Sequence, residues 1–315
     1  MIDYSVFYKR SINTERIAEE LPEYDIFVSA FNSSERVGKV YNTISAKKKI
    51  WLIHPEYQYP PIEYPQENPK ICPDDRNESS QVRVLLAEMG DLEGKSICID
   101  TTGFMRHVLI FLVASLFYKK VKKFTALYSE PLFYQKQGDT LFSTASSGIP
   151  RTLQGMYGSN GNGDDHLIIN VGYDHKLIGE VVDNKEGSSI FPIFSFPSLS
   201  ADMYQQSALR SSKAGGVALS SGWTNNRHFS PANDPFANAA VISQIVHKID
   251  SQCVDSNIYL TPLSTKIQAL GAALYWVLEG KNRGRVSIFL PECLTYSRET
   301  SLGLKRLWSF EVEFI

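Results

Sequence analysis

ICIDTTG, residues 97–103, is a short apolar run that ends in an acidic side chain, two threonines and a glycine, and a base follows at Arg106. Such a run is typical of a buried strand that passes directly into a helix. IYLTPLSTK, residues 258–266, repeats the pattern, with hydroxyl side chains after the apolar run and a base at Lys266. We therefore expect strand-to-helix junctions at equivalent places in two copies of one unit.

An acidic residue, a tyrosine and a base follow each junction, and the spacing among these three residues is the same in both copies. They are Glu130, Tyr134 and Lys136 in the first copy, and Glu292, Tyr296 and Arg298 in the second. Upstream, apolar runs at 25–30 and 50–55 in the first copy match those at 166–171 and 191–197 in the second. The repeat predicts two similar units related by a pseudo-two-fold axis, with a ligand held between them.

The elements predicted along the chain alternate between strands and helices, which is the pattern of an α/β protein with mainly parallel sheets. In the first copy the predicted strands are residues 4–8, 25–30, 50–54, 96–101 and 124–128, and the helices are 33–44, 79–89 and 105–117. In the second copy the strands are 167–171, 190–195, 257–261, 286–290 and a closing strand at 308–314, and the helices are 175–184, 201–212, 235–249 and 266–278.

A stretch rich in glycine and asparagine, residues 155–165, predicts the boundary between a first domain at 1–155 and a second domain at 156–315. The second domain carries a loop insertion at 213–233, which suits a lid or binding loop, or else a disordered segment. The proline-rich residues 55–73 should wrap the surface, because proline excludes a helix or a central strand.

Composition predicts a soluble globular chain whose 315 residues, 43% of them hydrophobic, can fill two ordinary cores. The net charge of -2 gives no general attraction to nucleic acid, and the longest apolar run, 108–118, is too short to cross a bilayer. The four cysteines form no C-x-x-C pair, which favours a reduced, cytoplasmic location. The six histidines show no metal-ligand spacing, so we expect neither a metal nor a cofactor.

Ligands of parallel α/β sheets bind beyond the carboxyl ends of the strands, where helix N-termini point. Candidate ligand-binding residues are therefore those at the expected strand ends and in the segments that follow. They are Asn32, Thr101, Thr102, Gly103, Arg106, Tyr134, Lys136, Gly172, Tyr173, Asp174, Thr261, Ser264, Thr265, Lys266, Tyr296 and Arg298. Hydroxyls and bases could hold phosphate or ribose oxygens, and a tyrosine could stack on a nucleobase. The alternative is that the hydroxyls only cap helices.

Three carboxylates at predicted strand ends, Asp100, Glu130 and Glu292, are the candidates for catalysis. A carboxylate at such a place can act as a general base, or it can hold a ribose without reacting. The alternative is a strand-edge ion pair beside a packed tyrosine.

A strand that ends in Asp-Thr-Thr-Gly and leads into a helix with an early base resembles the strand–T-G-G-T-K–helix feature of CARF domains, the Rossmann-like sensors of CRISPR signalling nucleotides. The second copy keeps the ending Thr265-Lys266, whereas the first has Phe104-Met105-Arg106 where the family has Gly-Thr-Lys. Two such units are similar to the SAVED arrangement, a fused CARF pair of prokaryotic antiviral systems. The resemblance implies two tandem Rossmann-like units, a nucleotide or cyclic oligonucleotide ligand, and an effector protein as partner.

These patterns predict a nucleotide-binding regulatory or sensor protein of a prokaryotic defence system. One alternative is a hydrolase or glycosidase of an NAD-like nucleotide that uses the strand-end carboxylates. Another is a non-catalytic scaffold subunit of a defence complex. The sequence leaves open whether the chain is an enzyme.

Overall fold

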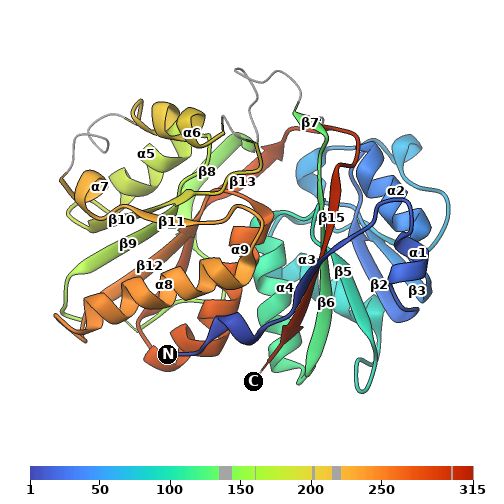
Figure 1. The fold of residues 1–315 in the computed structure, drawn as a ribbon, viewed down its shortest axis with the longest axis horizontal. Helices are drawn as coiled ribbons and strands as arrows, with labels where there is room; N and C mark the ends of the chain where they lie inside the picture. Colours follow the sequence, from blue (N-terminus) through green and yellow to red (C-terminus); the bar gives the residue numbers. More distant parts are fainter. Residues whose placement is uncertain (135–143, 160, 201–202, 215–220, 299–300, 315) are drawn as a thin grey trace. The chain divides into compact units, whose positions relative to one another are not determined.

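The computed structural model describes residues 1–134, 144–159, 161–200, 203–214, 221–298 and 301–314 (Figure 1). They form two compact units of α/β architecture. We call Phe7–Ser146 with Cys293–Ile315 the first unit, and Met1–Val6 with Ser147–Glu292 the second unit. Within the described part of the chain, no helix is both long enough and apolar enough to cross a bilayer.

The terminal segments of the chain are exchanged between the two units. Strand β15 (Arg306–Glu313) pairs antiparallel with β6 (Lys123–Glu130), and β1 (Lys9–Ile12) pairs antiparallel with β15. The strand expected at 308–314 therefore closes the sheet of the first unit, and the expectation that it belongs to the second copy is wrong. The chain passes from the first unit to the second after Ser146 and returns to the first unit after Glu292. The sequence instead predicts a single boundary at residue 155.

The first unit contains a seven-stranded sheet in the order β1-β15-β6-β5-β2-β3-β4. Its remaining strands are β2 (Tyr24–Ala30), β3 (Ala46–Leu52), β4 (Lys70–Ile71) and β5 (Ile97–Asp100). The strands from β4 to β6 are parallel. Its helices are α1 (Ile17–Glu20), α2 (Glu35–Thr43), α3 (Glu78–Met89) and α4 (Arg106–Tyr118). Two short strands, β7 (Phe133–Tyr134) and β14 (Ser301–Leu302), pair with each other in a separate sheet.

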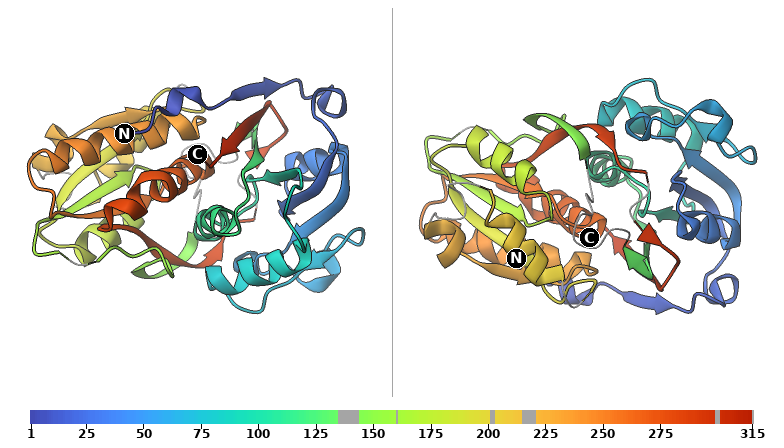
Figure 2. Two further views of the ribbon diagram at one scale, coloured as in Figure 1. Left: turned by 90° about the horizontal axis from the view of Figure 1, so that it is seen from below. Right: turned by 90° about the horizontal axis from the view of Figure 1, so that it is seen from above.

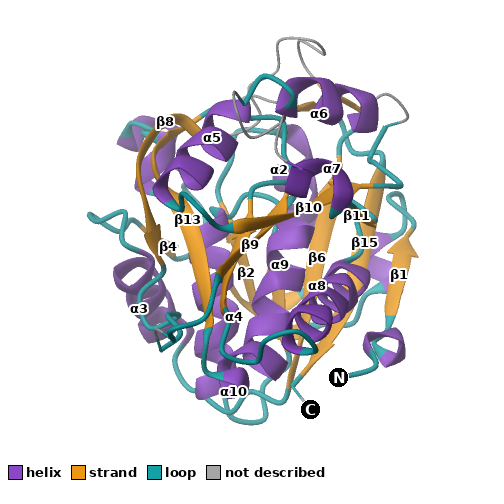
Figure 3. Cartoon of the chain, turned by 90° about the vertical axis from the view of Figure 1, so that its left-hand side faces the viewer, coloured by secondary structure: helices purple, strands orange, loops and turns teal. Residues whose placement is uncertain are grey.

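The second unit contains a six-stranded sheet in the order β11-β10-β9-β12-β13-β8. Figure 2 draws the same ribbon from below and from above, with the colours of Figure 1. Its strands are β8 (Thr144–Thr152), β9 (Asp165–Asn170), β10 (Ser189–Ser195), β11 (His228–Ser230), β12 (Asn257–Pro262) and β13 (Val286–Tyr296). Its helices are α5 (His175–Asn184), α6 (Met203–Ser211), α7 (Ser221–Asn225), α8 (Pro235–Asp250), α9 (Lys266–Tyr275) and α10 (Lys281–Arg283). Helices α8 and α9 pack side by side (Figure 3).

The parallel strands follow the same order in the two sheets. The first unit has β4-β3-β2-β5-β6, and the second has β11-β10-β9-β12-β13. Helices occupy the same places along the chain: α2 and α5 follow the first parallel strand, α3 and α8 precede the fourth, and α4 and α9 follow it. In both sheets the connections change direction between the first and fourth parallel strands, the place where ligands of open α/β sheets bind.

Three segments differ from the sequence-based expectation. Residues 4–8, expected as a strand, instead contain a turn of 3-10 helix at Tyr4–Val6. The segment 55–73 does not simply wrap the surface, because it begins with buried side chains such as Glu56 and Tyr57. In 213–233 the described residues include α7 and β11, and β11 occupies the sheet position that β4 has in the first unit.

Candidate functional site

A chain of buried hydrogen bonds links the carboxyl ends of β2, β5 and β6 in the first unit. Asp100, which is fully buried, accepts a hydrogen bond from Ser29 Oγ at 3.1 Å and another from the Thr102 backbone N–H at 3.0 Å. The Thr102 hydroxyl lies 2.9 Å from Ser129 Oγ and accepts from the Ser129 N–H at 3.0 Å. Burial raises the pKa of Asp100, and these hydrogen bonds and the charge of Arg36 only partly oppose the rise. Asp100 thus fastens three strand ends together.

Thr101 and Gly103 also contact neighbouring strands. The Thr101 hydroxyl donates to the Leu127 carbonyl oxygen at 2.8 Å. A Cβ atom on Gly103 would lie 2.0 Å from the Ala30 carbonyl oxygen, so only glycine lets the chain pass this close to the end of β2. Both residues therefore support the edge of the sheet where the sequence places a ligand.

Arg36, in the first turn of α2, reaches the same edge, although no motif marks it in the sequence. Its Nη1 donates to the Ser129 carbonyl oxygen, while its buried Nε has no hydrogen-bond partner among the described residues. Burial raises the pKa of Tyr128 to about 12, and the charge of Arg36 acts against that rise. Burial also raises the pKa of Tyr296, which the charges of Arg106 and Arg36 lower. Two arginines therefore act on the same tyrosine.

Two tyrosines from the segment after β3 cover the place where the connections change direction. The Tyr57 hydroxyl donates to the Gly103 carbonyl oxygen at 3.1 Å. The Tyr59 hydroxyl accepts from the Ser33 N–H at 3.0 Å and donates to Ser33 Oγ at 3.1 Å. We call Tyr57 and Tyr59 the tyrosine cap, because they bridge the segments that follow β5 and β2.

Arg298 holds this cap in place. Its Nε donates to the Tyr57 carbonyl oxygen at 2.8 Å, and its guanidinium lies 4.5 Å from the centre of the Tyr59 ring. The Asn32 side chain donates to the Arg298 carbonyl oxygen at 3.3 Å, and the Tyr296 ring meets the Tyr57 ring edge-on at 5.4 Å. Tyr296 and Arg298, which the sequence assigns to the second copy, therefore belong to the first unit.

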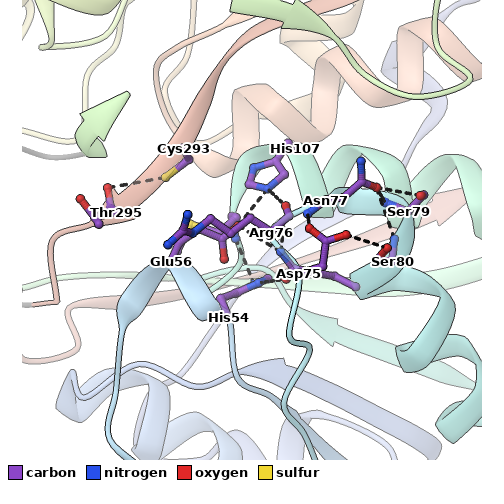
Figure 4. A network of polar contacts seen from close by, with 12 residues as sticks. His54, Glu56, Asp75, Arg76, Asn77, Ser79, Ser80, His107, Cys293 and Thr295 are labelled. Carbon is purple, nitrogen blue, oxygen red and sulfur yellow. Dashed lines mark hydrogen bonds and ion pairs between the residues drawn. The ribbon is translucent and has the colours of Figure 1, made fainter. Parts of the chain in front are cut away.

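A second buried polar cluster lies beside the cap, and we call it the first-unit junction (Figure 4). His107 Nε2 lies 3.1 Å from Glu56 Oε1, which also accepts from Gln81 Nε2 at 3.0 Å. His54 Nε2 accepts from the Met105 N–H at 3.2 Å, so its Nδ1 carries the proton and donates to Gln81 Oε1 at 2.6 Å. Glu56 is fully buried, and its Oε2 has no partner among the described residues. Burial alone would raise the pKa of Glu56, but the hydrogen bond from His107 holds it below its ordinary value.

The second unit has a neutral counterpart, which we call the second-unit junction. Asn238 Oδ1 accepts from Asn170 Nδ2 at 2.7 Å and from Ser230 Oγ at 3.0 Å, and its Nδ2 donates to the Gln268 carbonyl oxygen at 2.9 Å. Gln268 Nε2 donates to Ser230 Oγ at 2.9 Å, and its Oε1 accepts from Ser195 Oγ at 3.1 Å. Asn238 stands in α8 at the same distance from its helix cap as Gln81 stands in α3.

Several candidates of the second unit have structural roles. Thr265 caps α9 in a capping box with Gln268, and Asp174 caps α5, as the alternative interpretation of such residues predicts. A Cβ atom on Gly172 would lie 2.3 Å from the Leu263 carbonyl oxygen. The Tyr173 hydroxyl donates to the Met203 carbonyl oxygen of α6 at 3.3 Å.

The remaining candidates are dispersed over the two units. Ser264 Oγ lies 3.1 Å from Ser195 Oγ. Thr261 is buried near the end of β12, and Lys266 is the buried first residue of α9. Glu292 lies in β13 opposite Gly148. In the first unit, Glu130 Oε1 accepts from Trp308 Nε1 at 2.6 Å, and Tyr134 pairs with Ser301 between β7 and β14. Lys136 lies outside the described residues.

The first unit thus brings together Asn32, Thr101, Thr102, Gly103, Arg106, Tyr296 and Arg298 with Arg36 and the tyrosine cap. Within the described ranges, no group of three or more His, Cys, Asp or Glu side chains is arranged to hold a metal ion. No protein-family model matches the chain, and no curated protein matches it either.

Proposed function

We propose that the protein is a nucleotide-binding sensor and that the nucleotide binds at the carboxyl ends of the strands in the first unit. The observation that supports this function best is the cluster of Arg36, Arg106 and Arg298 with the tyrosine cap and Tyr296. A nucleotide combines phosphate with a flat base, so a site for it needs both positive charge and aromatic surface. The first unit supplies both at the edge of its sheet.

The common strand order of the two sheets supports the remaining parts of this proposal. Two units with the same order of parallel strands and helices are what a duplicated Rossmann-like unit would leave. The resemblance to CARF and SAVED domains then makes cyclic oligonucleotides, the signals of prokaryotic antiviral systems, the first ligands to try. An effector protein would carry the response.

The bonding of Asp100 and Glu130 favours a sensor over a hydrolase that would use either carboxylate. Asp100 is fully buried, and both of its oxygens accept hydrogen bonds. Glu130 accepts a hydrogen bond from the Trp308 indole. A general base must reach a proton of the substrate or of a water molecule, and a carboxylate that fastens strand ends together is badly placed for this task.

Thermal unfolding in the presence of a nucleotide panel tests the proposal. The panel comprises ATP, NAD, cyclic dinucleotides and cyclic oligoadenylates, and chromatography of the same mixtures detects any product. A ligand at one hundred times its Kd should stabilise the chain by about 2.7 kcal/mol without being consumed. Arg298→Ala should weaken this response, whereas Arg16→Ala, which removes an arginine that is 61% exposed in the same unit, should not. A panel without any stabilising member, or a ligand that is turned over, would contradict a sensor.

A further inference from the structure

We infer that the turn between α4 and β6 is a binding surface for single-stranded nucleic acid. The turn carries Lys119, Lys120, Lys122 and Lys123, which we call the lysine turn. The lysines pair with phosphate groups, and neighbouring aromatic rings stack on unpaired bases. The inference goes beyond the proposed function and does not depend on it, because other residues and a macromolecular partner are involved.

The lysine turn concentrates positive charge on the surface of the first unit. All four side chains are exposed, and none forms an ion pair with another described residue. Glu313 stands opposite Lys123 in the register of β15 and β6, so it offsets part of the charge at one end of the turn. A helix C-terminus favours cations, which accounts for Lys119 and Lys120, but Lys122 and Lys123 lie beyond it. The fold therefore leaves part of this charge for a partner.

The backbone of the turn is fixed in one conformation. The Val121 N–H donates to the Leu116 carbonyl oxygen at 3.1 Å, and the Lys120 N–H donates to the Phe117 carbonyl oxygen at 2.9 Å. These are the two bonds of a Schellman motif, which ends a helix. Lys120 has a φ of 60°, in the left-handed region where glycine is the favoured residue. The chain thus carries a lysine where a glycine would fit the backbone better.

A row of aromatic rings borders the lysine turn. Tyr118, which is 61% exposed, meets the Phe117 ring edge-on at 5.6 Å, and Phe117 meets Phe314 edge-on at 5.5 Å. Phe117 and Phe314 are partly exposed, and the Phe314 N–H donates to the Lys122 carbonyl oxygen at 2.9 Å. Single-stranded nucleic acid is bound by positive charge along its backbone and by aromatic rings that stack on its bases. The rings favour a single strand over an acidic peptide, which has no bases to stack.

The second unit neutralises its bases at the corresponding place. Arg283 and Arg285 lie between α9 and β13, as the lysine turn lies between α4 and β6. Arg283 forms an ion pair with Asp250 at 2.7 Å, and Arg285 forms one with Asp255 at 2.5 Å. Bases before the last parallel strand can therefore be paired within this fold, and the lysine turn differs in leaving its charges to the solvent.

Fluorescence anisotropy of the full chain with a labelled oligothymidylate tests the surface. The logarithm of the binding constant should fall with the logarithm of the salt concentration, by about 0.7 for each phosphate that is paired. The double variant Lys119→Gln/Lys122→Gln should flatten this slope by about 1.4. The matched control, Lys70→Gln/Lys176→Gln, removes two exposed lysines elsewhere and should leave the slope unchanged.

Two single variants separate stacking from charge. Tyr118→Leu should weaken the binding about 5-fold or more without altering the salt slope, because it removes a stacking ring and no charge. Lys120→Gly should weaken the binding and flatten the slope while it raises the melting temperature, because glycine suits the left-handed backbone. A lysine turn with a structural role alone would not give these opposite changes.

A wild-type chain that binds no oligothymidylate, or a salt slope that the lysine variants leave unchanged, would overturn the inference. Equal affinity for a duplex of the same length would do so too, because paired bases cannot stack on Tyr118. Binding of polyglutamate or of phosphatidylserine vesicles in place of the oligonucleotide would assign the turn to a protein or a membrane and refute the nucleic-acid surface. Each of these results leaves the nucleotide sensor untouched, because the sensor is tested with other ligands and variants.

Discussion

The junction beside the tyrosine cap is ionisable in the first unit, and the corresponding junction of the second unit is neutral. In the first unit Glu56, His54 and His107 meet around Gln81, whereas amides and hydroxyls meet around Asn238 in the second. Both junctions are buried, and both join the end of the second parallel strand to the helices on either side of the fourth. The same fold is thus completed with and without ionisable groups.

The fold itself does not require a buried carboxylate at the junction, because the second-unit junction is completed without one. Removing an ionised carboxylate from water carries a large free-energy penalty, which a hydrogen-bonded partner must offset. Amide and hydroxyl groups complete the second-unit junction without that penalty. Because Glu56 directly precedes Tyr57, the ionisable junction fixes the first residue of the cap. We therefore associate Glu56 with the position of the cap.

The largest effect is expected from His107→Leu, which leaves the Glu56 carboxylate without its imidazole partner. Breaking a buried pair by removing one member typically costs about 3–5 kcal/mol of unfolding free energy. The matched change in the second unit, Asn238→Leu, should cost only about 1–3 kcal/mol, because it strands neutral groups. Urea unfolding combined with hydrogen exchange reports on the two units separately. Equal losses in the two variants would remove the distinction between the junctions.

The losses of unfolding free energy in His107→Leu and Asn238→Leu should also depend differently on pH. The pKa of Glu56 is lowered in the folded chain, so its contribution to stability is present above the ordinary value of 4.5 and is lost as the pH falls through the folded value. The deficit of His107→Leu should therefore shrink below pH 4.5, and the deficit of Asn238→Leu should not. Glu56→Gln in the wild-type background should flatten this acid-dependent part of the stability curve.

A smaller loss is expected where the two units are alike, at the close approach between the ends of the first and fourth parallel strands. Gly103→Ala would bring a Cβ atom to 2.0 Å from the Ala30 carbonyl oxygen, and Gly172→Ala would bring one to 2.3 Å from the Leu263 carbonyl oxygen. Each should cost about 1–3 kcal/mol, the usual range for overpacking. Gly38→Ala in α2, where nothing lies within 4 Å, should instead stabilise the chain by about 0.5–1 kcal/mol. Thermal unfolding of the three variants checks the order, which a neutral Gly103→Ala would contradict.

The smallest effect concerns the hydroxyls that cover the strand ends. Tyr57→Phe removes the hydrogen bond to the Gly103 carbonyl oxygen, and Tyr173→Phe removes the bond to the Met203 carbonyl oxygen in the second unit. Each should lower the unfolding free energy by about 0.5–1.5 kcal/mol. Only Tyr57→Phe should also change the affinity for a nucleotide. A change of affinity in Tyr173→Phe alone would move the site to the second unit.

The sequence predicts the longer parallel strands, because each is a continuous apolar run followed by small or polar residues. It misses β4 and β11, which are parallel strands of two and three residues without an apolar run. It does not predict which sheet β15 joins, since its pattern fits the edge of either sheet and only hydrogen bonding to β6 decides. Thr101, Thr102 and Gly103 lie at a strand end, where the run of residues places them. The first-unit junction escapes notice because His54, Glu56, Gln81 and His107 come from separate segments, and Arg36 because a base in a helix is too common to stand out.

The place of β15 in the first unit has a consequence for the order in which the chain can fold. During synthesis β6 is complete long before β15 leaves the ribosome, so an unpaired strand edge stays open while the whole second unit is made. Open strand edges invite pairing with other chains, and contacts this distant in sequence form slowly. The first unit can therefore close its sheet only after translation reaches residue 313, and until then its open strand edge favours aggregation.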